Sequence, residues 1–155
     1  MDKNPDGLQG ASTRVSRVIK APRKAVYGAF LDPDAMTGHI HTFEPREGGR
    51  FRMSLTYQNP EDSPGGRGGK TSEDMDTFEG KFVELIPDEK IVWVTEFESQ
   101  EPGFAGEMRI TWSLADANGG TQVTVLCENI PQGIRLEDNE AGSRSSLHKL
   151  AVLLE

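Results

Sequence analysis

Between Arg50 and Tyr57 the side chains alternate strictly between polar and apolar. Because successive side chains of a strand point to opposite faces, this pattern predicts a strand with one apolar face. The apolar set is Phe51, Met53, Leu55 and Tyr57. The segment Glu107–Leu114 alternates in the same way, with an apolar set of Met108, Ile110, Trp112 and Leu114. Strands of this kind form a sheet whose apolar face has to be covered by a second layer.

Four further segments are rich in the β-branched and aromatic residues of strands: Thr13–Ile19, Thr77–Ile86, Lys90–Glu98 and Thr121–Glu128. Turn residues separate the later strands, with Pro87-Asp88-Glu89 before one and Asn118-Gly119-Gly120 before another. Strands that follow one another through short turns pair in antiparallel fashion. The chain is therefore expected to contain an antiparallel sheet.

Helical periodicity occurs near both ends of the chain. The segment Pro22–Leu31 begins with a proline, which suits a first helical turn because its missing N–H has no partner there in any case. One more short helical turn is expected over residues 34–38. At the C-terminus, a stripe with helical spacing is formed by Leu147, Leu150, Ala151 and Leu154. Helices at the ends of a run of antiparallel strands predict an α+β domain.

Size, charge and cysteine content narrow the class of protein. The 155 residues suit one domain, which we expect over residues 13–155 after a flexible leader at residues 1–12. A net charge of −8 repels phosphate backbones, so nucleic-acid binding is disfavoured. The lone Cys127 excludes an intramolecular disulfide. No signal peptide and no stretch of about 20 apolar residues is present, so we expect a soluble cytoplasmic protein without a membrane span.

One helix is too narrow to cover the predicted sheet. A helix with its side chains is about 10 Å wide, whereas six or seven strands spaced about 4.8 Å apart are much wider. A sheet that curls around the helix leaves space for large side chains or for a ligand. The candidates that line this space are Phe51, Met53, Leu55, Tyr57, Trp93, Phe97, Met108, Ile110 and Trp112, with Leu147 on the helix. The simpler alternative is that they fill the core.

Ordered segments of the chain resemble a known family. They include "SRVIKAPRKAVYGAFLDPDAM", "EPREGGRFRMSLTY", "TFEGKFVELIPDEKIVWVTEF" and "EAGSRSSLHKLAVLLE". Together they are similar to the START-like (SRPBCC) superfamily, and within it to the branch homologous to the C-terminal domain of the activator of heat-shock protein 90 ATPase. The resemblance implies the helix-grip fold, in which a sheet of six or seven antiparallel strands wraps a long C-terminal helix around a cavity.

The chain departs from this family at two positions. Relatives often carry a tryptophan shortly after the first helix, where this chain has Thr37, Gly38 and His39. Relatives often read Gly-Trp before the last helix, where this chain has Gly142-Ser143. Smaller residues at these positions would widen the mouth of the cavity. The glycine-rich segment 59–74 is expected to be a mobile loop at the entrance.

Residues capable of chemistry are few and scattered. His39 and His41 have the spacing of a pair of metal ligands. A zinc site needs three or four ligands, and nothing in the sequence places His148 or Cys127 beside this pair. We therefore expect no metal and assign the two histidines to the rim of the pocket. Cys127 is expected to be a buried packing residue. No catalytic motif is present. A cyclase-like activity would need polar groups inside the cavity, for which the candidates are Tyr57, Arg109, His148, Ser143, Ser145 and Ser146.

Three functions are compatible with this pattern. The favoured one is binding of a small hydrophobic, aromatic or lipid-like molecule in the cavity, without a cofactor and in a monomer or homodimer. The second is a co-chaperone that docks on a heat-shock ATPase through a patch outside the cavity. The third is a polyketide cyclase-like enzyme, which requires a buried ionisable group with a shifted pKa.

Overall fold

The computed structural model describes residues 11–32, 39–56, 75–97 and 106–155. Their element order is β1 (Ala11–Ile19), α1 (Arg23–Phe30), β2 (His39–Phe43), β3 (Arg50–Thr56), β4 (Met75–Ile86), β5 (Lys90–Phe97), β6 (Met108–Ala117), β7 (Gly120–Ile130) and α2 (Leu136–Leu154). Residues 1–10, the predicted turn at 34–38 and the predicted loop at 59–74 lie outside the described residues.

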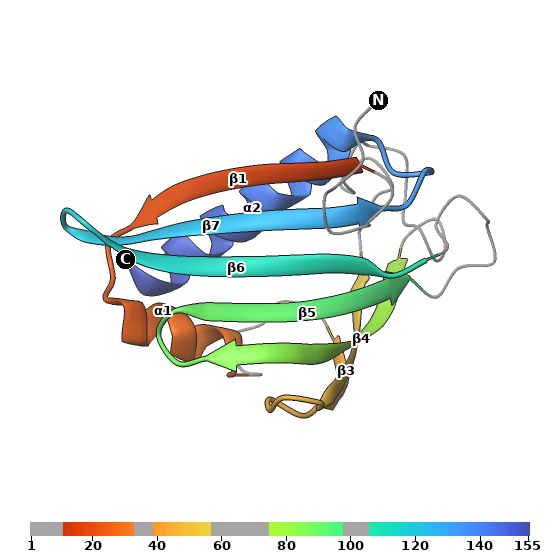
Figure 1. The fold of residues 1–155 in the computed structure, drawn as a ribbon, viewed down its shortest axis with the longest axis horizontal. Coiled ribbons are helices and arrows are strands. Elements are labelled where there is room, and N and C mark those ends of the chain that lie inside the picture. Colours follow the sequence, from red (N-terminus) through yellow and green to blue (C-terminus); the bar gives the residue numbers. More distant parts are fainter. Residues whose placement is uncertain (1–10, 33–38, 57–74, 98–105) are drawn as a thin grey trace.

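The described strands form one antiparallel sheet in the order β1-β7-β6-β5-β4-β3-β2. Strands that follow one another from β2 to β7 are neighbours, and β1 pairs with β7, the last strand of the chain. Figure 1 shows the sheet from its outer face, with both helices behind it. The predicted α+β fold, with six or seven antiparallel strands and a long C-terminal helix, is confirmed.

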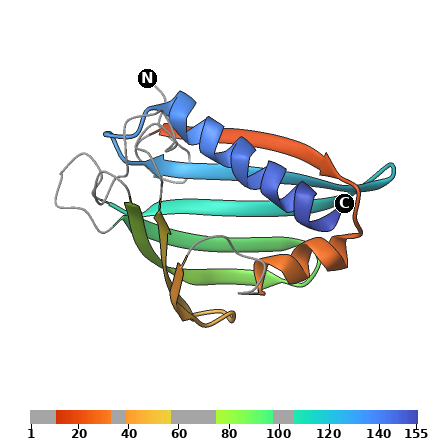
Figure 2. The same cartoon turned by 180° about the vertical axis from the view of Figure 1, so that it is seen from behind.

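The two helices lie on the same face of the sheet and cover different parts of it. The long helix α2 packs mainly on β1 and also contacts β7, while α1 contacts β5, β6, β7 and α2. Figure 2 shows α2 running across β1 and β7, with α1 near its C-terminal end. Val26 and Phe30 are the buried residues of α1, and Ser143, Leu147 and Ala151 are those of α2. The main contacts of the two helices therefore do not include β3 or β4.

The turns at one end of the sheet follow the sequence signals. Strands β6 and β7 are joined through Asn118 and Gly119, and Gly119 has a φ of +85°, which glycine adopts without steric cost. Strands β4 and β5 are joined through Pro87, Asp88 and Glu89. Asp88 there has a φ of +62°, a conformation in which aspartate is enriched among residues with a side chain. Both predicted turns are confirmed.

Several elements differ from the prediction by a few residues, and three of the differences concern β1, β2 and α2. The strand β1 begins at Ala11 instead of Thr13, because Ala11 pairs with Ile130 across a register shift. The histidine segment forms β2, an edge strand that no apolar alternation indicated. The helix α2 begins at Leu136, so Gly142-Ser143 lies inside it and not before it. Its first turn carries Glu137 and Asp138, which stabilise a helix N-terminus, whereas the apolar stripe begins later.

Candidate functional site

The predicted pocket residues whose side chains the structure describes lie between the sheet and the two helices. Phe51, Met108, Trp112 and Leu147 are buried members of the hydrophobic core, and Met53, Trp93 and Ile110 are partly buried and pack against it. Leu55 and Phe97 belong to β3 and β5, but their side chains are outside the described part of the chain, as is Tyr57. The structure thus brings six of the ten predicted side chains to one face of the sheet, with Leu147 on α2 in the same core.

Burial on this inner face is graded across the sheet. Leu147 of α2, at 1% exposed, and Trp112 of β6, at 7%, belong to the closed core between helices and sheet. Met53, Trp93 and Ile110 point to the same face but remain only half-buried. Cross-strand pairing places Trp93 of β5 directly beside Ile110 of β6. A large apolar side chain that packs on the core and still contacts solvent leaves apolar surface that a ligand can cover.

Aromatic rings from α1 and four strands meet at the centre of this face. Trp93 lies 5.6 Å from Phe51, 6.0 Å from Phe82 and 6.1 Å from Phe30, measured between ring centroids. These distances and the tilted or edge-on angles are those of favourable ring contacts. Trp112 of β6 completes the group, 4.9 Å from Phe30. Phe30 and Phe82 were not among the predicted site residues, although the helical spacing of Phe30 and the strand position of Phe82 indicated buried faces.

A small polar cluster lies between β1, β7 and the first half of α2. Cys127 is 3% exposed, and its Sγ lies 3.9 Å from Oγ of Ser143. Thr13 hydrogen-bonds Asn139, whose Nδ2 lies 3.7 Å from Sδ of Met108. Burial raises the pKa of the Cys127 thiol, and hydrogen bonds from Ser143, Thr13 and Asn139 oppose this increase only in part. The thiol therefore stays protonated at neutral pH, which suits the predicted packing role and not a nucleophile.

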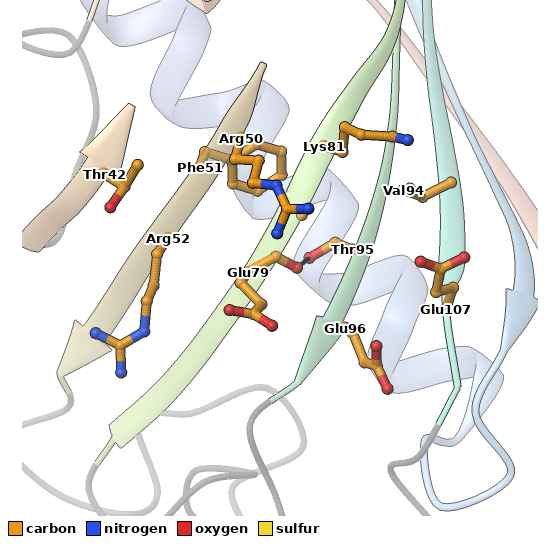
Figure 3. A pocket seen from close by; sticks show the side chains of 11 residues that line it. Thr42, Arg50, Phe51, Arg52, Glu79, Lys81, Val94, Thr95, Glu96 and Glu107 are labelled. Carbon is orange, nitrogen blue, oxygen red and sulfur yellow. Dashed lines mark hydrogen bonds between the residues drawn. The ribbon is translucent and has the colours of Figure 1, made fainter. Parts of the chain in front are cut away.

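The outer face of the sheet carries a separate, charged hollow of about 270 Å³. Its charged lining consists of Arg50, Arg52, Glu79, Lys81, Glu96 and Glu107. Figure 3 shows these side chains on strands in front of the translucent helices. Like charges are register partners here, with Arg50 opposite Lys81 and Glu79 opposite Glu96. The sequence did not predict this hollow, because the partners come from different strands.

The histidine segment lies at the margin of the sheet. His41 is exposed and its Nε2 lies 2.9 Å from Oγ of Ser54, which is buried on β3. The register between β2 and β3 shifts between Ile40 and Thr42, so His41 occupies an irregular position. Within the described residues, no three His, Cys, Asp or Glu side chains are placed to share a metal ion.

Neither of the helices described here is long and apolar enough to cross a membrane.

An antiparallel sheet that curls around a long C-terminal helix is the helix-grip fold of the START-like superfamily, and this protein has that fold. The chain belongs to the family of Activator of Hsp90 ATPase homolog 1-like proteins, whose model matches residues 20–155. No functionally curated protein matches the chain.

Solved structures of other proteins share the fold of this chain. Protein CV1439 from Chromobacterium violaceum is 29% identical with a TM-score of 0.78, covering 93% of this chain and 96% of that one. Mll3558 from Rhizobium loti is 20% identical with a TM-score of 0.70 and the same two coverages. DynU16, from the dynemicin biosynthetic locus, is 21% identical with a TM-score of 0.63, covering 93% of this chain and 47% of DynU16. The last two likenesses concern the fold alone.

Proposed function

We propose that this protein binds a small apolar or aromatic molecule on the inner face of its sheet, between β3, β5, β6 and the helices. The observation that carries the proposal is the half-burial of Met53, Trp93 and Ile110, which face the interior beside a closed core. A ligand that covers these side chains gains about 25 cal/mol of binding free energy for each Å² of apolar surface removed from water. Ring contacts with Trp93 add about 0.5–1.5 kcal/mol.

The lining of this surface favours a largely uncharged guest. The described side chains around Trp93 are aromatic or aliphatic, and Thr95, the polar neighbour two residues on, directs its hydroxyl to the Glu79 carbonyl oxygen at 3.1 Å. A charged group placed among them would lose its hydration without a partner. The proposed ligands are therefore neutral ring systems or acyl chains.

Binding is expected to change the emission of the two tryptophans and to raise the melting temperature. The probes are 2-acetylnaphthalene, 1-naphthol and dodecanol, titrated into the intact protein. A ligand at 100 times its Kd adds about 2.7 kcal/mol to the free energy of unfolding, a shift of several degrees for a chain of this size. If none of the probes changes either signal up to its solubility limit, the proposal is wrong.

A matched pair of variants locates the site. Met53→Gln keeps the length of the side chain but places an amide on the inner face, so we expect ligand affinity to fall at least about fivefold. Val83→Gln makes the same kind of change at an exposed position and is expected to leave affinity unchanged. Equal losses in the two variants would place the ligand elsewhere.

A second candidate function is a co-chaperone that contacts an Hsp90 ATPase, and the charged hollow on the outer face favours it. Its charged side chains stand on the outer face, although Phe51 and Thr95 also line the hollow. The test is the ATPase rate of an Hsp90 with excess protein, compared between wild type and the double variant Arg50→Glu, Lys81→Glu. Stimulation that the double variant lacks, while Arg144→Glu on α2 retains it, supports this role. An unchanged ATPase rate with wild type argues against it.

A further inference from the structure

The indole N–H of Trp112 has no hydrogen-bond acceptor in the part of the chain that the structure describes. Among the described residues, it is the one buried side-chain nitrogen or oxygen of which this is true. Trp112 is 7% exposed and lies at the centre of the inner face of β6. Leaving a buried donor unpaired costs about 1–3 kcal/mol, which is large beside the usual stability of a domain.

The surroundings of Trp112 explain why the protein supplies no acceptor. Its ring lies 4.9 Å from Phe30 and 5.9 Å from Trp93. Its register partners on the adjacent strands are Ile91 and Val125, both at most 2% exposed. These four side chains offer hydrocarbon surface to the ring, and the antiparallel ladders on both sides of β6 occupy the backbone carbonyls. A phenylalanine would fill much of the same space without an unpaired donor.

We propose that Nε1–H of Trp112 donates a hydrogen bond to a neutral oxygen acceptor on the ligand, such as the carbonyl oxygen of an aromatic ketone. This inference rests on the proposed binding function and adds a polar requirement to it. The acceptor is neutral because none of the four neighbouring side chains carries a positive charge that would compensate a buried anion. Trp112 thus favours a ligand that carries an oxygen acceptor over a hydrocarbon of similar shape.

Two ligands of nearly equal shape test the inference against Trp112→Phe. The ketone 2-acetylnaphthalene presents a carbonyl, and 2-isopropenylnaphthalene replaces that oxygen with a methylene group. Both are titrated by calorimetry into wild type and variant. Since one net hydrogen bond is worth about 0.5–1.5 kcal/mol, we expect the variant to lose about 2- to 12-fold more affinity for the ketone than for the hydrocarbon.

The indole N–H signal in an NMR spectrum provides a second measurement on the wild-type protein. The chain has two tryptophans, so two indole signals are expected, and Trp93→Phe identifies them even if Trp112→Phe does not fold. The ketone should move the Trp112 proton downfield, and the hydrocarbon should not. Equal affinity losses for both ligands, together with an unmoved signal, would overturn the inference and leave the binding function intact. Failure of both ligands to bind wild type would overturn the inference, and failure of 1-naphthol and dodecanol as well would overturn the binding function.

Discussion

Replacing Phe82 with alanine is expected to lower the free energy of unfolding by about 3–5 kcal/mol. Phe82 is 1% exposed and heads the group of large side chains that are fully buried. Its ring lies 5.4 Å from Phe51, 5.9 Å from Phe43 and 6.0 Å from Trp93. The variant loses the transfer free energy of the ring and leaves a cavity whose walls are ring faces and edges that do not collapse easily.

Chemical denaturation measures this effect, with Phe82→Leu as the control. Leucine keeps most of the apolar volume, so we expect a loss below about 1.5 kcal/mol. A loss below about 1 kcal/mol for Phe82→Ala would mean that the aromatic group is loosely packed at this point. It would also weaken the proposed site, because the same rings support Trp93.

The second large effect is expected at Gly80 of β4. A Cβ at this position would lie 2.2 Å from the carbonyl oxygen of Val94 and 2.5 Å from Cζ of Phe51. The first contact is with the backbone of a paired strand, which cannot move without breaking the ladder. Gly80→Ala is therefore expected to lower the free energy of unfolding by roughly 3 kcal/mol, the upper end of the usual cost of overpacking.

Gly142→Ala is the matched control for this substitution. Gly142 lies inside α2, and an added Cβ there would meet no atom within 4 Å. Because alanine is the better helix former, we expect this variant to gain about 0.5–1 kcal/mol. Denaturation of both variants under the same conditions separates the effect of the clash from any general effect of losing a glycine. Similar stabilities for the two would show that β4 and β5 can separate at Gly80.

Features that depend on one segment were predictable from the sequence. Alternation alone placed Phe51 and Trp112 on the inner face, and helical spacing placed Leu147 on the buried side of α2. Cys127 was predicted to be buried, and it is. In each case the period of the local structure determines which side of the element faces the core. The antiparallel sheet followed from the turn signals between consecutive strands.

Features that depend on the register between strands were not predictable. The charged hollow brings Glu79 and Glu96 together because they are register partners, and no property of either segment alone fixes that pairing. The contact between His41 and Ser54 depends on a register shift in β2. The closeness of Gly80 to Phe51 likewise appears only when β3 and β4 are aligned. Whether the N–H of Trp112 has an acceptor depends on all the residues around it, which come from several elements.

The two margins of the sheet differ from its interior in a way that bears on self-association. The pairing of each edge strand with its neighbour contains a register shift, between Ala11 and Thr13 for β1 and between Ile40 and Thr42 for β2. The strand β2 is also only five residues long, and β1 bears the exposed charges Arg14 and Arg17. Bulges, short length and charged side chains all hinder an edge strand from pairing with a strand of another molecule. An unclosed sheet of this kind is thereby protected against growing into a cross-β aggregate.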